Sequence, residues 1–221
     1  MKKKPNAAVR TQSALDWASA LQPLFKKYRG RKHPLNYHNL YELIVLVVLS
    51  SQMTDDRINT LAPDFFKRYP TLKRLADAKP EDMYDIIRSV RGSKKKAKWL
   101  VDIARNVGDD AKLPRTMEGL TSLAGIGRKS ANVIIRESGG KAEGVIVDLH
   151  VIRVVPRLGI TNEEKPDKIE QRLMDIVPQE QWNDAGMSFS FLGRELCRPT
   201  DPRCQDCLLN SVCQYYRASH R

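Results

Sequence analysis

Apolar side chains recur along the chain at the three- and four-residue spacing of an amphipathic helix, with polar residues between them. Two such stripes are formed by Leu15, Ala18, Leu21 and Phe25, and by Met83, Ile86, Ile87 and Val90. Residues 43–49 form the longest uninterrupted apolar run, far shorter than the roughly 20 residues of a membrane-spanning helix. We therefore expect this run to be a buried helix, with no membrane partner.

Signals for helix starts indicate many short helices. Asp55, Thr71 and Pro80 each precede or open an apolar helical repeat, where capping residues and proline are favoured. Residues 144–147 have the composition of a short strand, but periodicity leaves open whether they are a strand or a buried connection. Because strand-like alternation is otherwise scarce, the sequence predicts an all-α protein.

The net charge of the chain indicates the class of its partner. The 221 residues include 38 Lys and Arg against 26 Asp and Glu, a formal net charge of +12. Such a chain associates with polyanions, either nucleic acid or an anionic membrane surface. Lys94, Lys95 and Lys96 are expected either on a solvated helix face or in contact with phosphates. Residues 1–4 are basic, but no apolar segment follows them, so we expect a cytoplasmic protein.

A turn between two predicted helices contains Gly125 and Gly127. Glycine permits positive φ and close approach to a ligand, and the helix that follows offers free N–H groups. Such a turn suits a DNA phosphate. Many helix pairs are joined by glycine-containing turns without any ligand, so the turn alone leaves both interpretations open.

The residues around this turn extend the motif. Residues 123–131 read Leu-Ala-Gly-Ile-Gly-Arg-Lys-Ser-Ala, and residues 147–154 read Val-Asp-Leu-His-Val-Ile-Arg-Val. Together these strings resemble the endonuclease III family of helix-hairpin-helix DNA glycosylases. The resemblance implies that Lys129 is a catalytic nucleophile and that Asp148, 19 residues later, is its partner.

An amine is suited to this chemistry, because attack on the sugar C1′ followed by Schiff base formation serves both base removal and strand cleavage. A lysine pKa near 10.4 must be lowered for this at neutral pH, and burial and nearby cations would do so. Asp148 would raise it, so we favour stabilisation of the cationic sugar as its role over acceptance of a proton. The structural alternative is that Asp148 caps the helix beginning at Leu149 and Lys129 is a surface residue.

The resemblance also implies DNA contacts. Gly125, Gly127 and Arg128 of the hairpin would bind the backbone, and Gln52 would enter the base stack when a damaged base is extruded. His150 is a second candidate for a DNA contact.

This chain departs from the family pattern at two places. Family members usually carry a bulky apolar wedge where Arg91-Gly92-Ser93 stands here, so the wedge is missing or relocated. Ala124 replaces the proline that is common before the two glycines. The first departure leaves the lesion range and the opposite-base preference undetermined.

The chain contains four cysteines, separated by six, two and five residues. They are Cys197, Cys204, Cys207 and Cys213. Spacing leaves zinc or disulfides as alternatives, although zinc sites more often use two close pairs. The resemblance implies that these cysteines hold a [4Fe-4S] cluster, with Arg194, Arg198 and Arg203 around the ligands.

These observations lead to one expected architecture. It has two helical lobes: residues 33–142 form a six-helix domain with the helix-hairpin-helix motif, and residues 1–32 plus 143–221 form the iron-sulfur cluster domain. We expect a monomer, associated with the nucleoid, that binds double-stranded DNA containing damaged bases or abasic sites.

The expected activity is that of a bifunctional DNA N-glycosylase and AP lyase in base excision repair. It would remove oxidised pyrimidines and cleave the strand by β-elimination through a Lys129 Schiff base. The adenine-removing branch of the family is disfavoured, because that branch lacks this lysine. The alternative is a non-catalytic or monofunctional helix-hairpin-helix DNA-binding protein with a cluster.

Overall fold

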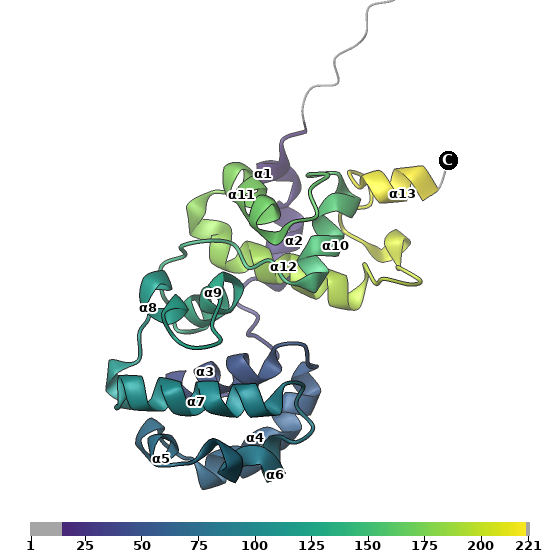
Figure 1. The fold of residues 1–221 in the computed structure, drawn as a ribbon. Coiled ribbons are helices and arrows are strands. Elements are labelled where there is room, and N and C mark those ends of the chain that lie inside the picture. Colours follow the sequence, from purple (N-terminus) through teal and green to yellow (C-terminus); the bar gives the residue numbers. More distant parts are fainter. Residues whose placement is uncertain (1–14, 220–221) are drawn as a thin grey trace, which may run out of the picture.

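The computed structural model describes residues 15–219, and every regular element in that part of the chain is a helix (Figure 1). This confirms the all-α class. Residues 144–147 form no strand and are a buried connection between two helices. The basic residues 1–4 lie outside the described residues.

Figure 1 shows the helices in three tiers. The lower tier contains α3 (Leu40–Ser50), α4 (Asp55–Arg68), α5 (Leu72–Ala76), the 3-10 turn η1 (Pro80–Met83), α6 (Tyr84–Ile87) and α7 (Ser93–Val107). The middle tier contains α8 (Met117–Thr121) and α9 (Arg128–Glu137), and the 3-10 turn η2 (Asp110–Lys112) precedes it. The upper tier contains α1 (Trp17–Ala20), α2 (Gln22–Tyr28), α10 (Leu149–Leu158), α11 (Pro166–Ile176), η3 (Gln179–Gln181), α12 (Trp182–Glu195), η4 (Cys204–Asp206) and α13 (Gln214–Ser219).

Helix α9 joins the middle tier to the lower tier, and α12 is the central helix of the upper tier. In the middle tier, α9 packs against both α8 and α3, so its position is fixed by the lower tier. In the upper tier, α12 packs against α10 and α2. The chain passes from α9 to α10 through the buried connection at residues 144–147.

The predicted helix starts hold, with two differences. Thr71 caps α5 by accepting a hydrogen bond from the Arg74 N–H, and Asp55 is the first residue of α4. Pro80, in contrast, opens a 3-10 turn instead of an α-helix. Leu15 lies outside the first helix and is 45% exposed, contrary to the predicted stripe. The Asp16 side chain caps α1 by accepting from the Ser19 N–H, so the helix begins only after Asp16.

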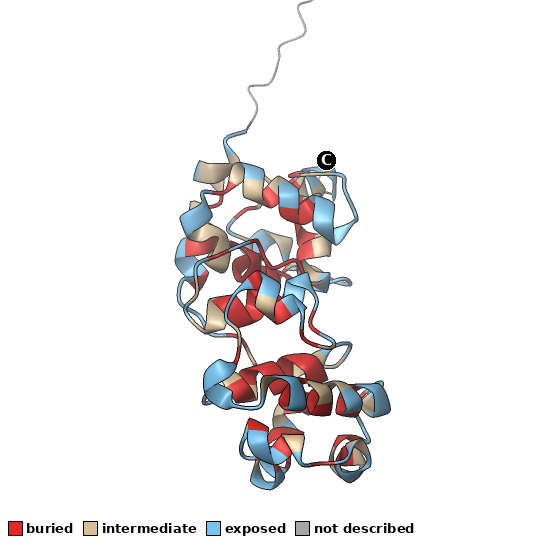
Figure 2. Ribbon diagram, turned by 60° about the vertical axis from the view of Figure 1, so that its left-hand side comes forward, coloured by how far each residue is buried: buried red, intermediate tan, exposed pale blue. Residues whose placement is uncertain are grey.

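The apolar run at residues 43–49 lies in α3, and all seven of its side chains are buried. Figure 2 shows buried residues along the helices that face the interior, whereas the outer faces are exposed. Because α4, α7 and α9 all pack against α3, this helix is covered on several sides, which explains why it lacks a polar face. Within residues 15–219 no helix is both long and apolar enough to cross a bilayer.

The three lysines at positions 94–96 differ in their exposure, which neither expectation anticipated. Lys94 and Lys95 are exposed, but Lys96 is only 5% exposed. Its Nζ donates hydrogen bonds to the carbonyl oxygens of Leu49 (2.8 Å) and Ser51 (2.7 Å), at the end of α3. Both interpretations are therefore wrong for Lys96, which caps a helix end from inside the protein, and burial lowers its pKa to about 8.

Candidate active site and cysteine cavity

The hairpin between α8 and α9 requires glycine at one of its two positions. Gly125 has a φ of +79°, and a Cβ there would lie 2.4 Å from Cε3 of the Trp99 ring. Gly127 has an ordinary extended φ of −94° and open space where a Cβ would be. Gly125 is thus needed for the turn itself, whereas the surroundings of Gly127 leave room for another molecule beside the first N–H groups of α9.

Lys129 is the second residue of α9, and its side chain is exposed. Protein atoms nevertheless surround it closely enough that desolvation lowers its pKa. The negative charges of Asp148 and Asp55 oppose this shift, and the Arg194 guanidinium supports it. Burial of the amine therefore outweighs the two carboxylates, even though the residue as a whole is exposed.

Asp148 caps α10, as the structural interpretation of this residue anticipated. Its Oδ1 accepts hydrogen bonds from the backbone N–H groups of His150 and Val151, both at 2.9 Å. Its Oδ2 accepts from the Ser190 Oγ at 2.6 Å. The carboxylate is thus fixed in one orientation, with its charge close enough to Lys129 to affect the pKa of the amine.

Three residues that the sequence did not single out for the site extend this arrangement. The Arg194 Nη1 pairs with Asp55 Oδ2 at 2.7 Å, and the Arg194 Nε donates to Ser190 Oγ at 3.4 Å. A continuous network therefore runs from Asp148 on α10, through α12, to the first residue of α4. Arg194 was expected beside the cysteines, but its polar contacts are with this network.

His33 also belongs to this charged region. It is only 9% exposed and lies near Asp55, Lys129 and Arg194, whose charges act on it. Burial lowers the pKa of His33 to about 4, so the imidazole is neutral at physiological pH. No local motif marks His33, because its neighbours come from distant parts of the chain.

Gln52 lies in the turn between α3 and α4 and is exposed. Its φ of +62° is in the left-handed region, where a non-glycine residue is strained. The two hydrogen bonds of Lys96 fix the start of this turn. The backbone N–H of Arg91 donates to the Met53 sulfur at 3.3 Å, which places the altered wedge segment directly beside Gln52.

The other two predicted DNA contacts are partly occupied by the protein itself. Arg128 donates from Nε to Glu170 Oε2 at 2.8 Å and from Nη2 to the Glu143 carbonyl at 3.0 Å, although half of its side chain remains exposed. His150 lies 3.2 Å from the Arg153 guanidinium, and burial lowers its pKa. Leu149, between Asp148 and His150, is 78% exposed.

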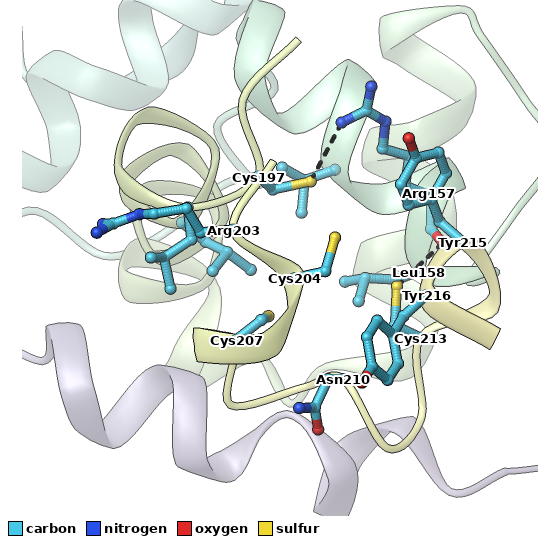
Figure 3. A pocket seen from close by; sticks show the side chains of 13 residues that line it. Arg157, Leu158, Cys197, Arg203, Cys204, Cys207, Asn210, Cys213, Tyr215 and Tyr216 are labelled. Carbon is cyan, nitrogen blue, oxygen red and sulfur yellow. Dashed lines mark hydrogen bonds between the residues drawn. The ribbon is translucent and has the colours of Figure 1, made fainter. Parts of the chain in front are cut away.

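All four cysteines are free thiols and line one cavity at the C-terminal end of the upper tier (Figure 3). The cavity is also lined by apolar side chains and by polar ones that include Arg157, Arg203 and Asn210. The Arg157 Nη1 lies 3.7 Å from the Cys197 sulfur. Burial raises the pKa of the Cys204 and Cys207 thiols. Within residues 15–219, no three His, Cys, Asp or Glu side chains are arranged to hold a single metal ion.

The Ser190 hydroxyl is the basis of a stability prediction with a matched control. Ser190→Ala removes the donor to Asp148 and should lower the free energy of unfolding by about 1–3 kcal/mol. Ser188 lies two residues earlier in α12, and its hydroxyl is buried without a hydrogen-bond partner. Ser188→Ala should therefore be neutral or stabilising. Urea denaturation of both variants tests this, and equal losses would contradict it.

Comparisons with known proteins agree with this geometry. The family model for HhH-GPD superfamily base excision DNA repair proteins matches residues 45–179. Endonuclease III of Synechocystis sp. is 35% identical over 198 residues, covering 89% of this chain and 90% of that protein. Endonuclease III of Thermotoga maritima is 32% identical over 191 residues, covering 85% of this chain and 89% of that protein. A solved structure of a trapped endonuclease III–DNA covalent intermediate has a TM-score of 0.83 and 30% identity, covering 92% of this chain and 96% of that chain. The chain belongs to the endonuclease III family, within the HhH-GPD superfamily of base excision DNA repair proteins.

Proposed function

We propose that this protein is a bifunctional DNA N-glycosylase and AP lyase that removes oxidised pyrimidines. The observation that carries the proposal is Lys129, an amine with a lowered pKa at the start of the helix after the hairpin, close to the fixed carboxylate of Asp148. The relatives named endonuclease III and the trapped covalent DNA intermediate support it.

The reaction follows from the two side chains. The Lys129 Nζ lone pair forms a bond to C1′ while the bond from C1′ to the base breaks, and the departing base takes one of the two protons of the amine. The C1′–O4′ bond then breaks, O4′ takes the second proton, and Nζ and C1′ form a Schiff base. Removal of a proton from C2′ breaks the C3′–O bond and nicks the strand. Asp148 stabilises the positive charge that develops on the sugar as the base departs.

Double-stranded DNA with a damaged base or an abasic site is the proposed partner, bound by a monomer. Gly125, Gly127 and the first N–H groups of α9 would bind a phosphate, with Arg128 and His150 nearby. The strained, exposed turn at Gln52 suits a side chain that replaces an extruded base in the stack. We also propose that the lobes are residues 33–142, and residues 1–32 plus 143–221.

We propose that the four cysteines hold a [4Fe-4S] cluster. The donor set fits, because four free thiols line one cavity and thiolate is the ligand such clusters require. Arg157 would place positive charge near the anionic ligands. When bound, the cluster would cross-link the end of α12, η4 and the start of α13, because the four cysteines lie in and between these elements.

Borohydride trapping tests the nucleophile. Wild-type protein should form a covalent complex with DNA containing an oxidised pyrimidine, because borohydride reduces the Schiff base to a stable amine. Lys129→Ala should abolish trapping while binding to the same DNA remains within about twofold. Lys168→Ala, which removes an exposed lysine from α11, serves as the control and should trap normally. If the wild type traps nothing, the protein is instead a non-catalytic or monofunctional DNA-binding protein, and release of the free base distinguishes these two.

The pH dependence of trapping provides a separate prediction. The neutral amine is the nucleophile, so the rate should rise with pH and level off below the usual lysine value of about 10.4. Arg194→Gln removes a cation that lowers the pKa of Lys129 and frees the charge of Asp55, so the whole profile should move to higher pH. An unchanged profile in this variant would contradict the electrostatic account.

The cofactor is tested by its colour and metal content. Protein purified without oxygen should absorb broadly in the visible range and contain iron and sulfide in equal amounts. Cys204→Ser should lower the iron content and the melting temperature, because a ligand of the cross-link is lost. A colourless protein loaded with zinc would exclude the cluster.

A further inference from the structure

We propose that Glu170 is a positioning residue for the reaction, which holds the helix of Lys129 and the segment leading to Asp148 in a fixed relation. This inference rests on the proposed roles of those two residues. Glu170 lies on α11, touches neither of them, and is only 7% exposed. A buried carboxylate costs stability unless it is paired and hydrogen-bonded, and each of its partners lies on one of the two parts of the site.

The contacts of Glu170 join α9 to the connection that follows it. The Arg128 Nε donates to Oε2 at 2.8 Å, and the Asn132 Nδ2 donates to Oε1 at 3.1 Å. These residues flank Lys129, one residue before it and three residues after it. The backbone N–H of Val145, three residues before Asp148, donates to Oε1 at 3.2 Å. One carboxylate therefore binds both the helix of the amine and the chain that carries its partner.

Gly144 shows how closely this contact is fitted. A Cβ at Gly144 would lie 2.1 Å from Glu170 Oε1, 2.8 Å from Arg128 Nη2 and 2.9 Å from Asn132 Nδ2. The φ of Gly144 is not in the left-handed region, so the restriction is one of space and not of backbone conformation. A side chain at this position would therefore have to displace the carboxylate and its two donors.

Further contacts fix the same segment on either side. The Arg128 Nη2 donates to the Glu143 carbonyl at 3.0 Å, and the Glu143 carboxylate accepts from the Met117 N–H at 3.0 Å, at the start of α8. A Cβ at Gly186 of α12 would lie 2.4 Å from the Ile146 carbonyl oxygen, so α12 packs directly on the backbone of the connection. Glu170 is the buried carboxylate of this set, and it accepts hydrogen bonds from both parts of the site.

Position matters here because covalent attack needs the reacting atoms at near-contact distance, and misplacement by about 1 Å can lower a rate by about 100-fold. Without the carboxylate, Arg128, Asn132 and the Val145 N–H would all lose an acceptor in a buried region. The hairpin and the Asp148 segment would then be held together only by the contacts of Glu143 and the packing of Gly186 on Ile146, and their relative position would be less fixed. DNA binding through the hairpin backbone would remain, whereas the alignment of the amine with the carboxylate would not.

The experiment uses full-length, cluster-loaded protein in excess over a duplex with a single abasic site, trapped with borohydride at successive times. Glu170→Ala should lower the single-turnover rate constant by about 10- to 100-fold. The fraction of DNA finally trapped and the affinity for an uncleavable abasic analogue should stay unchanged. Gly144→Ala should produce the same pattern, because its methyl group displaces the carboxylate from the other side.

Two further variants sharpen the result. Glu170→Gln keeps an acceptor for Val145 but loses the charge that holds Arg128, so its rate constant should lie between wild type and Glu170→Ala. Asp167→Asn removes an exposed carboxylate three residues earlier in α11 and should react like wild type. A purely structural role for Glu170 would lower the trapped fraction and the melting temperature and leave the rate constant of the folded molecules unchanged.

The outcomes separate the two proposals. Normal rate constants in Glu170→Ala and Gly144→Ala, with trapping by wild type, would overturn the positioning role and leave the proposed function in place. Absence of trapping by wild type would overturn both. If Glu170→Ala does not fold, Glu170→Gln and Gly144→Ala decide the question by the same measurement.

Discussion

Loss of water from the ammonium group of Lys129 is the interaction on which the rest of this site depends. Each unit by which a lysine pKa falls corresponds to about 1.4 kcal/mol taken from the charged form. Here the protein lowers that pKa by surrounding the amine while two carboxylates, Asp148 and Asp55, act in the opposite direction. Arg194 pairs with Asp55 and so partly balances one of them. The helices that position these residues belong to different tiers, so the lowered pKa of the proposed nucleophile depends on the assembled fold.

The same fold uses many of its cations internally. Short helices leave carbonyl groups unpaired at their C-terminal ends. In this protein basic side chains donate hydrogen bonds to such carbonyl oxygens. Lys96 donates to those of Leu49 and Ser51, Arg105 to those of Ala76 and Ala78, and Arg153 to those of Gly193 and Cys197. A net charge of +12 therefore overstates the positive surface that faces a polyanion, although the sign of that charge still identifies the class of partner.

The features that depend on residues close in the sequence were predicted correctly. The all-α class, the buried helix at residues 43–49 and the cap at Thr71 depend on neighbours within one or two turns, and each is present. The network from Asp55 through Arg194 to Asp148 could not be predicted, because Asp55 and Arg194 are 139 residues apart and meet only through packing. The burial of Lys96 was not predicted for the same reason. A lysine on an exposed helix face and a lysine that caps a distant helix can have the same neighbours in the sequence. The roles of Lys129 and Asp148 came from a resemblance to a family and not from spacing alone.

Asp148 illustrates how folding and chemistry can constrain one position for different reasons. One of its oxygens accepts hydrogen bonds from two backbone N–H groups of α10. Asparagine, serine or threonine can also cap a helix in this way. A descendant of this chain without catalytic activity would therefore still be expected to keep a capping residue there. The Lys129 side chain, in contrast, donates no hydrogen bond to any of residues 15–219, so its capping role in the fold is nil. Among diverging copies of this gene, the lysine would therefore be the first of the pair to drift when selection for the reaction is relaxed.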